Sequence, residues 1–187
     1  MPTTAEFRKG FKIEVNGEPF VIVDFLHVKP GKGGAFVRTK LKSLLTGNIL
    51  EQTFRSGERV ESPDIEEKEA QYLYNDGEKY YFMDKESYWQ FELPADQLGD
   101  NKDFLQENIT VTVLFYNKNP IGVALPIFVE LRIDRTEPGV RGDTASGGTK
   151  PARLETGAMI QVPLFLEEGD IVKIDTRTGE YVERVTK

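Results

Sequence analysis

The chain has 187 residues with no cysteine and a single histidine, His27, which excludes disulfides, cysteine-ligated metals and thiol catalysis. A single histidine also argues against a metal site built from several histidines and against a Ser-His-Asp triad. Hydrophobic residues make up 39% and charged residues 29%, as in a folded water-soluble protein, and no run of 18 apolar residues predicts a membrane span.

The formal net charge of -7 is unevenly distributed along the chain. Residues 1–63 hold 10 basic and 7 acidic side chains, a net charge of +3. Residues 64–127 hold 5 and 13, a net charge of -8, and residues 128–187 hold 9 and 11, a net charge of -2. This contrast between a basic first third and an acidic middle third indicates that one of the two binds a charged partner. The alternative is that the acidic residues only keep a β protein soluble.

The first third shows the two-residue periodicity of β-strands. Residues 11–15 alternate, Asn16-Gly17 is a strong hairpin signal because both turn positions need positive φ, and residues 20–25 form the returning strand. Residues 36–42 alternate again, and residues 49–54 continue after a turn. We expect about five short strands, which is typical of a small barrel.

The middle third predicts a hairpin over residues 71–83 around an Asp-Gly turn, then a strand at 88–91. Residues 93–105 are less regular and predict a short helix, and two strands follow at 109–116 and 121–125. Its many aromatic residues are expected in the core and in hairpin packing: Tyr72, Tyr74, Tyr80, Tyr81, Phe82, Tyr88, Trp89 and Phe91.

The last third predicts strands at residues 128–133, 159–166, 171–174 and 180–185, and a long loop at 137–151. The chain is therefore predicted to be all-β, with three small β modules. Their expected bounds are 1–63, 64–127 and 128–187. Because each module is small for a core of its own, we expect neighbouring modules to support one another.

The most unusual segment is the predicted hairpin tip Lys29-Pro30-Gly31-Lys32-Gly33-Gly34. Pro30 fixes one φ angle, and the glycines permit positive φ and a close approach of the backbone to a phosphate or a base. Lys32 would protrude without bulky neighbours. The segment is not a nucleotide-binding P-loop, because Lys32 is followed by glycine and then by a strand.

Three cations follow the tip at alternating positions, Arg38, Lys40 and Lys42, and so are predicted to share one face of a strand. Such a basic stripe suits an RNA backbone, with salt-dependent affinity. The alternative is an ordinary hairpin with solubilising lysines.

A second candidate lies in the predicted loop 137–151, which is polar and long enough to be functional. Arg141, Lys150 and Arg153 are candidates for phosphate contacts, and an ordinary connection is the alternative.

These segments resemble a known family, bacterial elongation factor P. Pro30-Gly31-Lys32-Gly33 with Ala35-Phe36, and residues 44–47 (LLTG), are similar to its first domain. Five further segments resemble the C-terminal domain of that family: residues 139–144 (GVRGDT), 150–152 (KPA), 154–157 (LETG), 162–165 (VPLF) and 175–181 (DTRTGEY).

The resemblance implies an SH3-like (KOW-type) domain followed by two OB-fold domains, in an L-shaped arrangement like tRNA. It implies a cytoplasmic monomer without a cofactor that binds both ribosomal subunits between the peptidyl and exit sites, contacts peptidyl-tRNA and stimulates peptide-bond formation at consecutive prolines. It implies that the factor is not an enzyme.

The resemblance also assigns roles to residues. Lys32 would reach the CCA end of peptidyl-tRNA and be extended covalently by a lysine-modifying enzyme, for example by β-lysylation. Arg141, Gly142, Asp143 and Thr144 would approach the small subunit and the mRNA codon in the exit site. Two other interpretations stay open on the residues alone: a general single-stranded RNA-binding protein, and a hydrolase that uses paired carboxylates.

Overall fold

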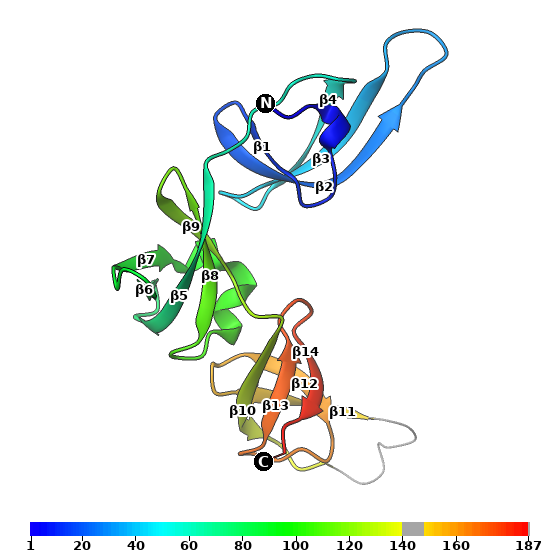
Figure 1. Cartoon of the computed structure of the whole chain (residues 1–187). Helices are drawn as coiled ribbons and strands as arrows, with labels where there is room; N and C mark the ends of the chain where they lie inside the picture. The colour runs from blue at the N-terminus through cyan, green and yellow to red at the C-terminus, as the bar shows by residue number, and fades with distance from the viewer. Residues whose placement is uncertain (140–147, 187) are drawn as a thin grey trace. The chain divides into compact units, whose positions relative to one another are not determined.

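The computed structural model describes residues 1–139 and 148–186. The chain forms two compact units, Met1–Glu67 with Leu114–Gly122, and Lys68–Val113 with Val123–Lys187. Three antiparallel sheets follow one another along the sequence, and short helical turns lie only in the first and second thirds of the described chain (Figure 1). The all-β prediction is confirmed.

The first sheet has four strands in the order β1-β2-β3-β4, preceded by a 3-10 turn, η1. The bounds are η1 Thr4–Glu6, β1 Lys12–Val15, β2 Glu18–Val28, β3 Phe36–Ser43 and β4 Ile49–Arg55. The β1–β2 turn has positive φ at Asn16 and Gly17, as the sequence predicts. The prediction of about five strands was too high: beyond β4 only isolated bridges form, Thr3 with Arg59 and Glu14 with Glu61.

Strand β3 carries the alternation that matters for the candidate site. Its buried side chains, Val37, Thr39, Leu41 and Ser43, face the core, while the side chains between them are exposed. The core that receives them contains Phe7, Ile13, Phe20, Ile22, Val37, Leu41, Phe54 and Val60. Because the face of a strand changes with every residue, this buried set fixes which residues of β3 can meet a partner.

The second sheet has the order β7-β6-β5-β8-β9. Its strands are β5 Ile65–Asn75, β6 Lys79–Asp84, β7 Gln90–Pro94, β8 Thr110–Tyr116 and β9 Asn119–Ala124. The predicted helical segment is present as α1 Ala95–Leu98 and η2 Gly99–Phe104.

The aromatic residues of this sheet differ in burial, and Tyr80 and Tyr81 are half-buried. Tyr72, Phe82 and Phe91 are buried, in agreement with the predicted core packing. Tyr74, Tyr88 and Trp89 are exposed, so the prediction of core packing was wrong for them. The predicted hairpin packing is present for Tyr74, whose ring stacks on Tyr81 at 4.6 Å, and for Trp89, whose ring stacks on Phe91 at 5.2 Å. Tyr88 also has a φ of 60°, which places it in a tight turn between β6 and β7.

The third sheet has the order β12-β11-β10-β13-β14. Its strands are β10 Phe128–Thr136, β11 Thr149–Leu154, β12 Met159–Pro163, β13 Ile171–Asp175 and β14 Glu180–Arg184. Strand β11 begins inside the predicted loop 137–151, so that prediction was too long at its C-terminal end.

Phe104, from η2, belongs to the buried core that the third sheet forms around Leu131, Leu154 and Val172. The hydroxyl of Thr156 donates a hydrogen bond of 2.5 Å to the carbonyl oxygen of Asp103, next to that phenylalanine. A ring from the second third of the chain therefore completes the core of the last third.

Candidate nucleic-acid interface

The predicted tip, Lys29 to Gly34, lies in the connection between the long strands β2 and β3, which extends beyond the first sheet (Figure 1). The last pair of the β2–β3 ladder joins Val28 to Phe36, so residues 29–35 form the connection. Residues 29–34 are exposed, and Ala35 is half-buried. Here "the lysine loop" means residues 29–35.

Of the three glycines in the lysine loop, only Gly33 has a positive φ, 105°. A Cβ on Gly31, Gly33 or Gly34 would meet no atom within 4 Å. Gly33 is therefore required by its backbone conformation, whereas Gly31 and Gly34 are required by neither strain nor space. Their small size matters only toward an external partner.

Lys32 is exposed, and it makes no hydrogen bond or ion pair with the described residues. The same holds for Lys29. A lysine chain with four methylene groups and no partner on its own barrel can extend its ammonium group away from the protein surface. This arrangement agrees with the predicted outward-facing lysine.

Arg38, Lys40 and Lys42 are all exposed and share the outer face of β3, as predicted. Their cross-strand neighbours differ. Lys42 lies between Val21 and Ile49, and Arg38 between Leu26 and Thr53.

Lys40 has acidic neighbours on both sides, Asp24 on β2 and Glu51 on β4. Directly opposite side chains on a sheet have Cβ atoms about 4.5–5.5 Å apart, close enough for charges to interact. Asp24 is also 3.8 Å from the ammonium group of Lys9. The stripe is thus positive at Arg38 and Lys42, but close to neutral at Lys40.

A further cation on the same face was not predicted. Arg55, the last residue of β4, is the cross-strand neighbour of Phe36 and is exposed. The alternation Ile49, Glu51, Thr53, Arg55 was visible in the sequence. Its position beside Phe36 depends on the register of β3 and β4, which the sequence alone does not give.

The second predicted site, Arg141, Gly142, Asp143 and Thr144, lies outside the described residues. The other two cations proposed for it are already engaged in the third sheet. The ammonium group of Lys150 is buried and donates a hydrogen bond of 2.6 Å to the carbonyl oxygen of Glu137. The guanidinium group of Arg153 pairs with the carboxylate of Asp134. The prediction of phosphate contacts was therefore wrong for Lys150, which has a structural role.

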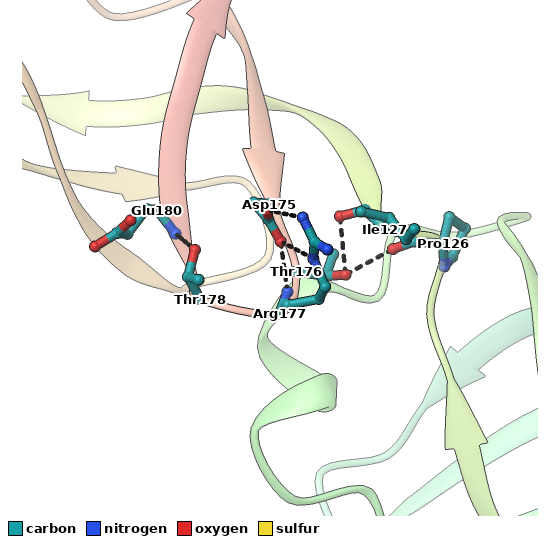
Figure 2. A network of polar contacts seen from close by, with 7 residues as sticks. All are labelled: Pro126, Ile127, Asp175, Thr176, Arg177, Thr178 and Glu180. Atoms are coloured by element: carbon teal, nitrogen blue, oxygen red, sulfur yellow. Dashed lines mark hydrogen bonds and ion pairs between the residues drawn. The ribbon is translucent and has the colours of Figure 1, made fainter. Parts of the chain in front are cut away.

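The motif at residues 175–181 forms the β13–β14 turn, and Figure 2 shows its polar contacts. The guanidinium group of Arg177 donates hydrogen bonds of 3.0 and 2.7 Å to the two carboxylate oxygens of Asp175. These bonds lower the pKa of Asp175 and raise the pKa of Arg177. The pair stabilises the turn and is not free to act as an acid or a base.

Thr176 connects this turn to the segment before β10. Its hydroxyl lies 2.6 Å from the carbonyl oxygen of Pro126 and 3.1 Å from that of Ile127, and its backbone N–H donates to Ile127 at 2.8 Å (Figure 2). The motif thus has a clear local role in the C-terminal fold.

The part of the chain that the structure describes contains no group of three or more histidine, aspartate or glutamate side chains that could hold a metal ion. In residues 1–139 and 148–186, no helix is long and apolar enough to cross a membrane.

Comparison with known proteins identifies the chain. Three family models match it in order: the elongation factor P KOW-like domain at residues 3–60, the elongation factor P OB domain at 65–123, and the elongation factor P C-terminal domain at 129–184. Elongation factor P of Natranaerobius thermophilus is 57% identical over 185 residues, covering 99% of this chain and 98% of the relative. That of Moorella thermoacetica is 58% identical over 184 residues, covering 98% of this chain and 100% of the relative. The chain belongs to the elongation factor P family.

Solved structures show a similar fold. Eukaryotic translation initiation factor 5A from Methanococcus jannaschii is 25% identical with a TM-score of 0.56, covering 64% of this chain and 88% of that one. A translation initiation factor eif-5a family protein from Naegleria fowleri has a TM-score of 0.52 at 18% identity, over 66% of this chain and 94% of that one, and shows the fold alone. The predicted fold class, a KOW-like domain with OB-type β domains, is confirmed for this member of the elongation factor P family.

Proposed function

We propose that this member of the elongation factor P family binds the ribosome between the peptidyl and exit sites and uses Lys32 to position the CCA end of peptidyl-tRNA. The proposal rests on one observation: in a chain 57% identical to a named elongation factor P, Lys32 is exposed and unpaired on the lysine loop. The task is to stimulate peptide-bond formation and relieve stalling at consecutive prolines.

The mechanism is positioning and not chemistry on the protein. Proline is a constrained nucleophile and donor, and a cation on a narrow loop can hold the terminal adenosines of tRNA by charge and hydrogen bonds. Restricting that end to a near-attack geometry lowers the entropic part of the barrier. The ribosome supplies the reaction centre, and this chain contributes no acid, base or nucleophile.

A covalent extension of Lys32 by a lysine-modifying enzyme fits the same site. The exposed amine is accessible, and the glycines beside it leave space around the ammonium group. A longer cationic group, such as β-lysyl, would increase the reach of the loop and add hydrogen-bond donors. The remaining parts of the proposal are a cytoplasmic monomer, no cofactor, and an exit-site mRNA contact by residues 141–144.

The test is the variant Lys32→Ala in a reconstituted translation system that makes a protein with consecutive prolines. We expect loss of the rescue of stalled synthesis, with an unfolding midpoint equal to that of the parent protein, because an exposed loop side chain contributes little packing. Full rescue by Lys32→Ala would overturn the role of this residue.

Two further measurements separate the open alternatives. A general RNA-binding protein would bind free single-stranded RNA as well as it binds ribosomes carrying peptidyl-tRNA. An enzyme would show turnover that a single aspartate or glutamate substitution destroys. The absence of both, together with ribosome-dependent rescue, supports the proposed function.

A further inference from the structure

Arg55 lies at the base of the lysine loop. It is the cross-strand neighbour of Phe36, the first residue of β3 after that loop. The pairing continues one step further, because the N–H of Ser56 donates a hydrogen bond of 3.0 Å to the carbonyl oxygen of Ala35. The end of β4 is thus joined directly to the segment that carries Lys32.

Phe36, Arg38 and Arg55 form one patch on the outer face of the first sheet, called here the loop-base patch. Phe36 and Arg38 are two residues apart on β3, so their side chains share a face. Arg38 pairs with Thr53, which makes Arg55 its diagonal neighbour. Diagonal neighbours on a sheet are about 7–8 Å apart, so both guanidinium groups can reach one phosphate or two successive ones.

No acid lies directly opposite a residue of the loop-base patch in either ladder, and the nearest acids on this face, Asp24 and Glu51, are diagonal neighbours of Arg38 on the side of Lys40. The cross-strand neighbours of Phe36 are Val28 and Arg55, and those of Arg38 are Leu26 and Thr53. Neither arginine takes part in an ion pair with the described residues. Lys40, one step further along the same face, lies between Asp24 and Glu51 and is the natural comparison.

The backbone of Arg55 is held in place from two sides. Its N–H donates a hydrogen bond of 2.7 Å to the carboxylate of Glu58, and its carbonyl oxygen accepts one of 3.0 Å from the N–H of Glu58. The buried hydroxyl of Thr4 contacts the same carbonyl oxygen at 3.4 Å and accepts a hydrogen bond of 2.8 Å from Gly57. A fixed backbone reduces the ordering that Arg55 must undergo on binding.

We propose that the loop-base patch is a binding site for RNA phosphate, in which Arg38 and Arg55 hold the sugar–phosphate backbone behind the nucleotides that the lysine loop reaches. Arginine suits this role because its planar guanidinium group can bind phosphate through two parallel hydrogen bonds. The half-buried ring of Phe36 offers an apolar surface to a ribose or a base between them. This inference rests on the proposed function and names residues that carry its RNA affinity.

The experiment measures binding of the full chain to ribosomes carrying peptidyl-tRNA over a series of salt concentrations. Arg55→Gln and Arg38→Gln should each weaken binding several-fold and reduce the slope of log K against log salt by about one. Lys40→Gln, which removes a cation of the same face that lies between two acids, should weaken binding less than either arginine variant. Arg55→Lys should retain the salt slope but bind more weakly than the parent, because a lysine cannot form the two-bond contact.

The outcomes distinguish this inference from the proposed function. If the parent protein rescues synthesis and Lys32→Ala does not, but Arg55→Gln and Lys40→Gln bind alike, the phosphate site is overturned and the proposed function stands. If the parent protein shows neither rescue nor salt-dependent ribosome binding, both are overturned. Equal unfolding midpoints for Arg55→Gln and the parent protein show that a loss of binding is not a loss of fold.

Discussion

Thr39 lies on β3, an inner strand of the first sheet, and its side chain is fully buried. Among the described residues, it is the only one whose buried side-chain oxygen lacks a hydrogen-bond partner. A hydroxyl transferred from water to an apolar site without a partner costs about 1–3 kcal/mol. Thr39 belongs to β3 and lies directly between the two exposed cations Arg38 and Lys40. The unpaired hydroxyl therefore destabilises the same strand that presents the candidate site.

We predict that Thr39→Val raises the free energy of unfolding by about 1 kcal/mol, because it removes the unpaired hydroxyl and retains a β-branched side chain. The measurement is urea unfolding of the full chain. Thr39→Ala is the control, and it should lower the free energy of unfolding because it leaves a cavity. A loss of stability in Thr39→Val would instead mean that the hydroxyl makes a favourable contact.

At the candidate site, the sequence predicted the residues of β3 but not their environment. The alternation of Arg38, Lys40 and Lys42 placed them on one face without any knowledge of partners. Which acids face Lys40, and which cation lies beside Phe36, depends on ladder register. That register includes an irregularity between Ile22 and Asp24 on β2, which alternation in the sequence does not reveal.

At the scale of the elements, the segment that follows β10 packs closely against Leu164 at Gly139. A Cβ on Gly139 would lie 2.6 Å from the carbonyl oxygen of Leu164 and 3.1 Å from its Cβ. Because the nearer atom belongs to the backbone, a side chain at this position requires one of the two segments to move. Gly139 also begins the motif at residues 139–144, so its role in that motif includes local packing.

We therefore predict that Gly139→Ala lowers the free energy of unfolding by about 1–3 kcal/mol, as overpacked sites do. Thermal and urea unfolding provide the measurement. Gly34→Ala is the matched control: Gly34 has no positive φ, and an added methyl group there would meet no atom within 4 Å, so the stability should be unchanged. Equal stability of the two variants would contradict the close approach at Leu164.

The elements differ in how well the sequence predicts them. The β1–β2 turn was predictable because Asn16 and Gly17 favour the positive φ that both adopt. Strand β11 was not, because Pro151 normally excludes a central strand and Lys150 normally excludes a buried position. The structure accommodates both: pairing with β10 ends at Ala152, so Pro151 is paired only with Gln161 on β12, and the ammonium group of Lys150 is bound by the carbonyl oxygen of Glu137.

In the whole molecule, the charges are segregated along the sequence. Residues 1–63 carry +3 and residues 64–127 carry -8. RNA repels acidic surfaces and attracts basic ones, so this distribution favours binding through the first third. The domain boundaries at 63 and 127 and the L-shaped arrangement stay predictions. From the charge distribution we further predict that the acidic third repels RNA and so favours its binding at the lysine loop.

The test of that role neutralises exposed acids of the middle third in one combined variant. Its substitutions are Glu86→Gln, Asp96→Asn, Asp100→Asn and Glu107→Gln, which change the net charge of residues 64–127 from -8 to -4. We expect affinity for a free single-stranded RNA to rise several-fold at low salt, because repulsion of the phosphates is reduced. The difference should vanish at about 1 M salt, where charges are screened within about 3 Å. The variant could instead equal the parent protein both in affinity for free RNA and in the salt dependence of ribosome binding. The acids would then serve solubility. The preference of RNA for the first third would have to come from the local geometry of the lysine loop and the loop-base patch.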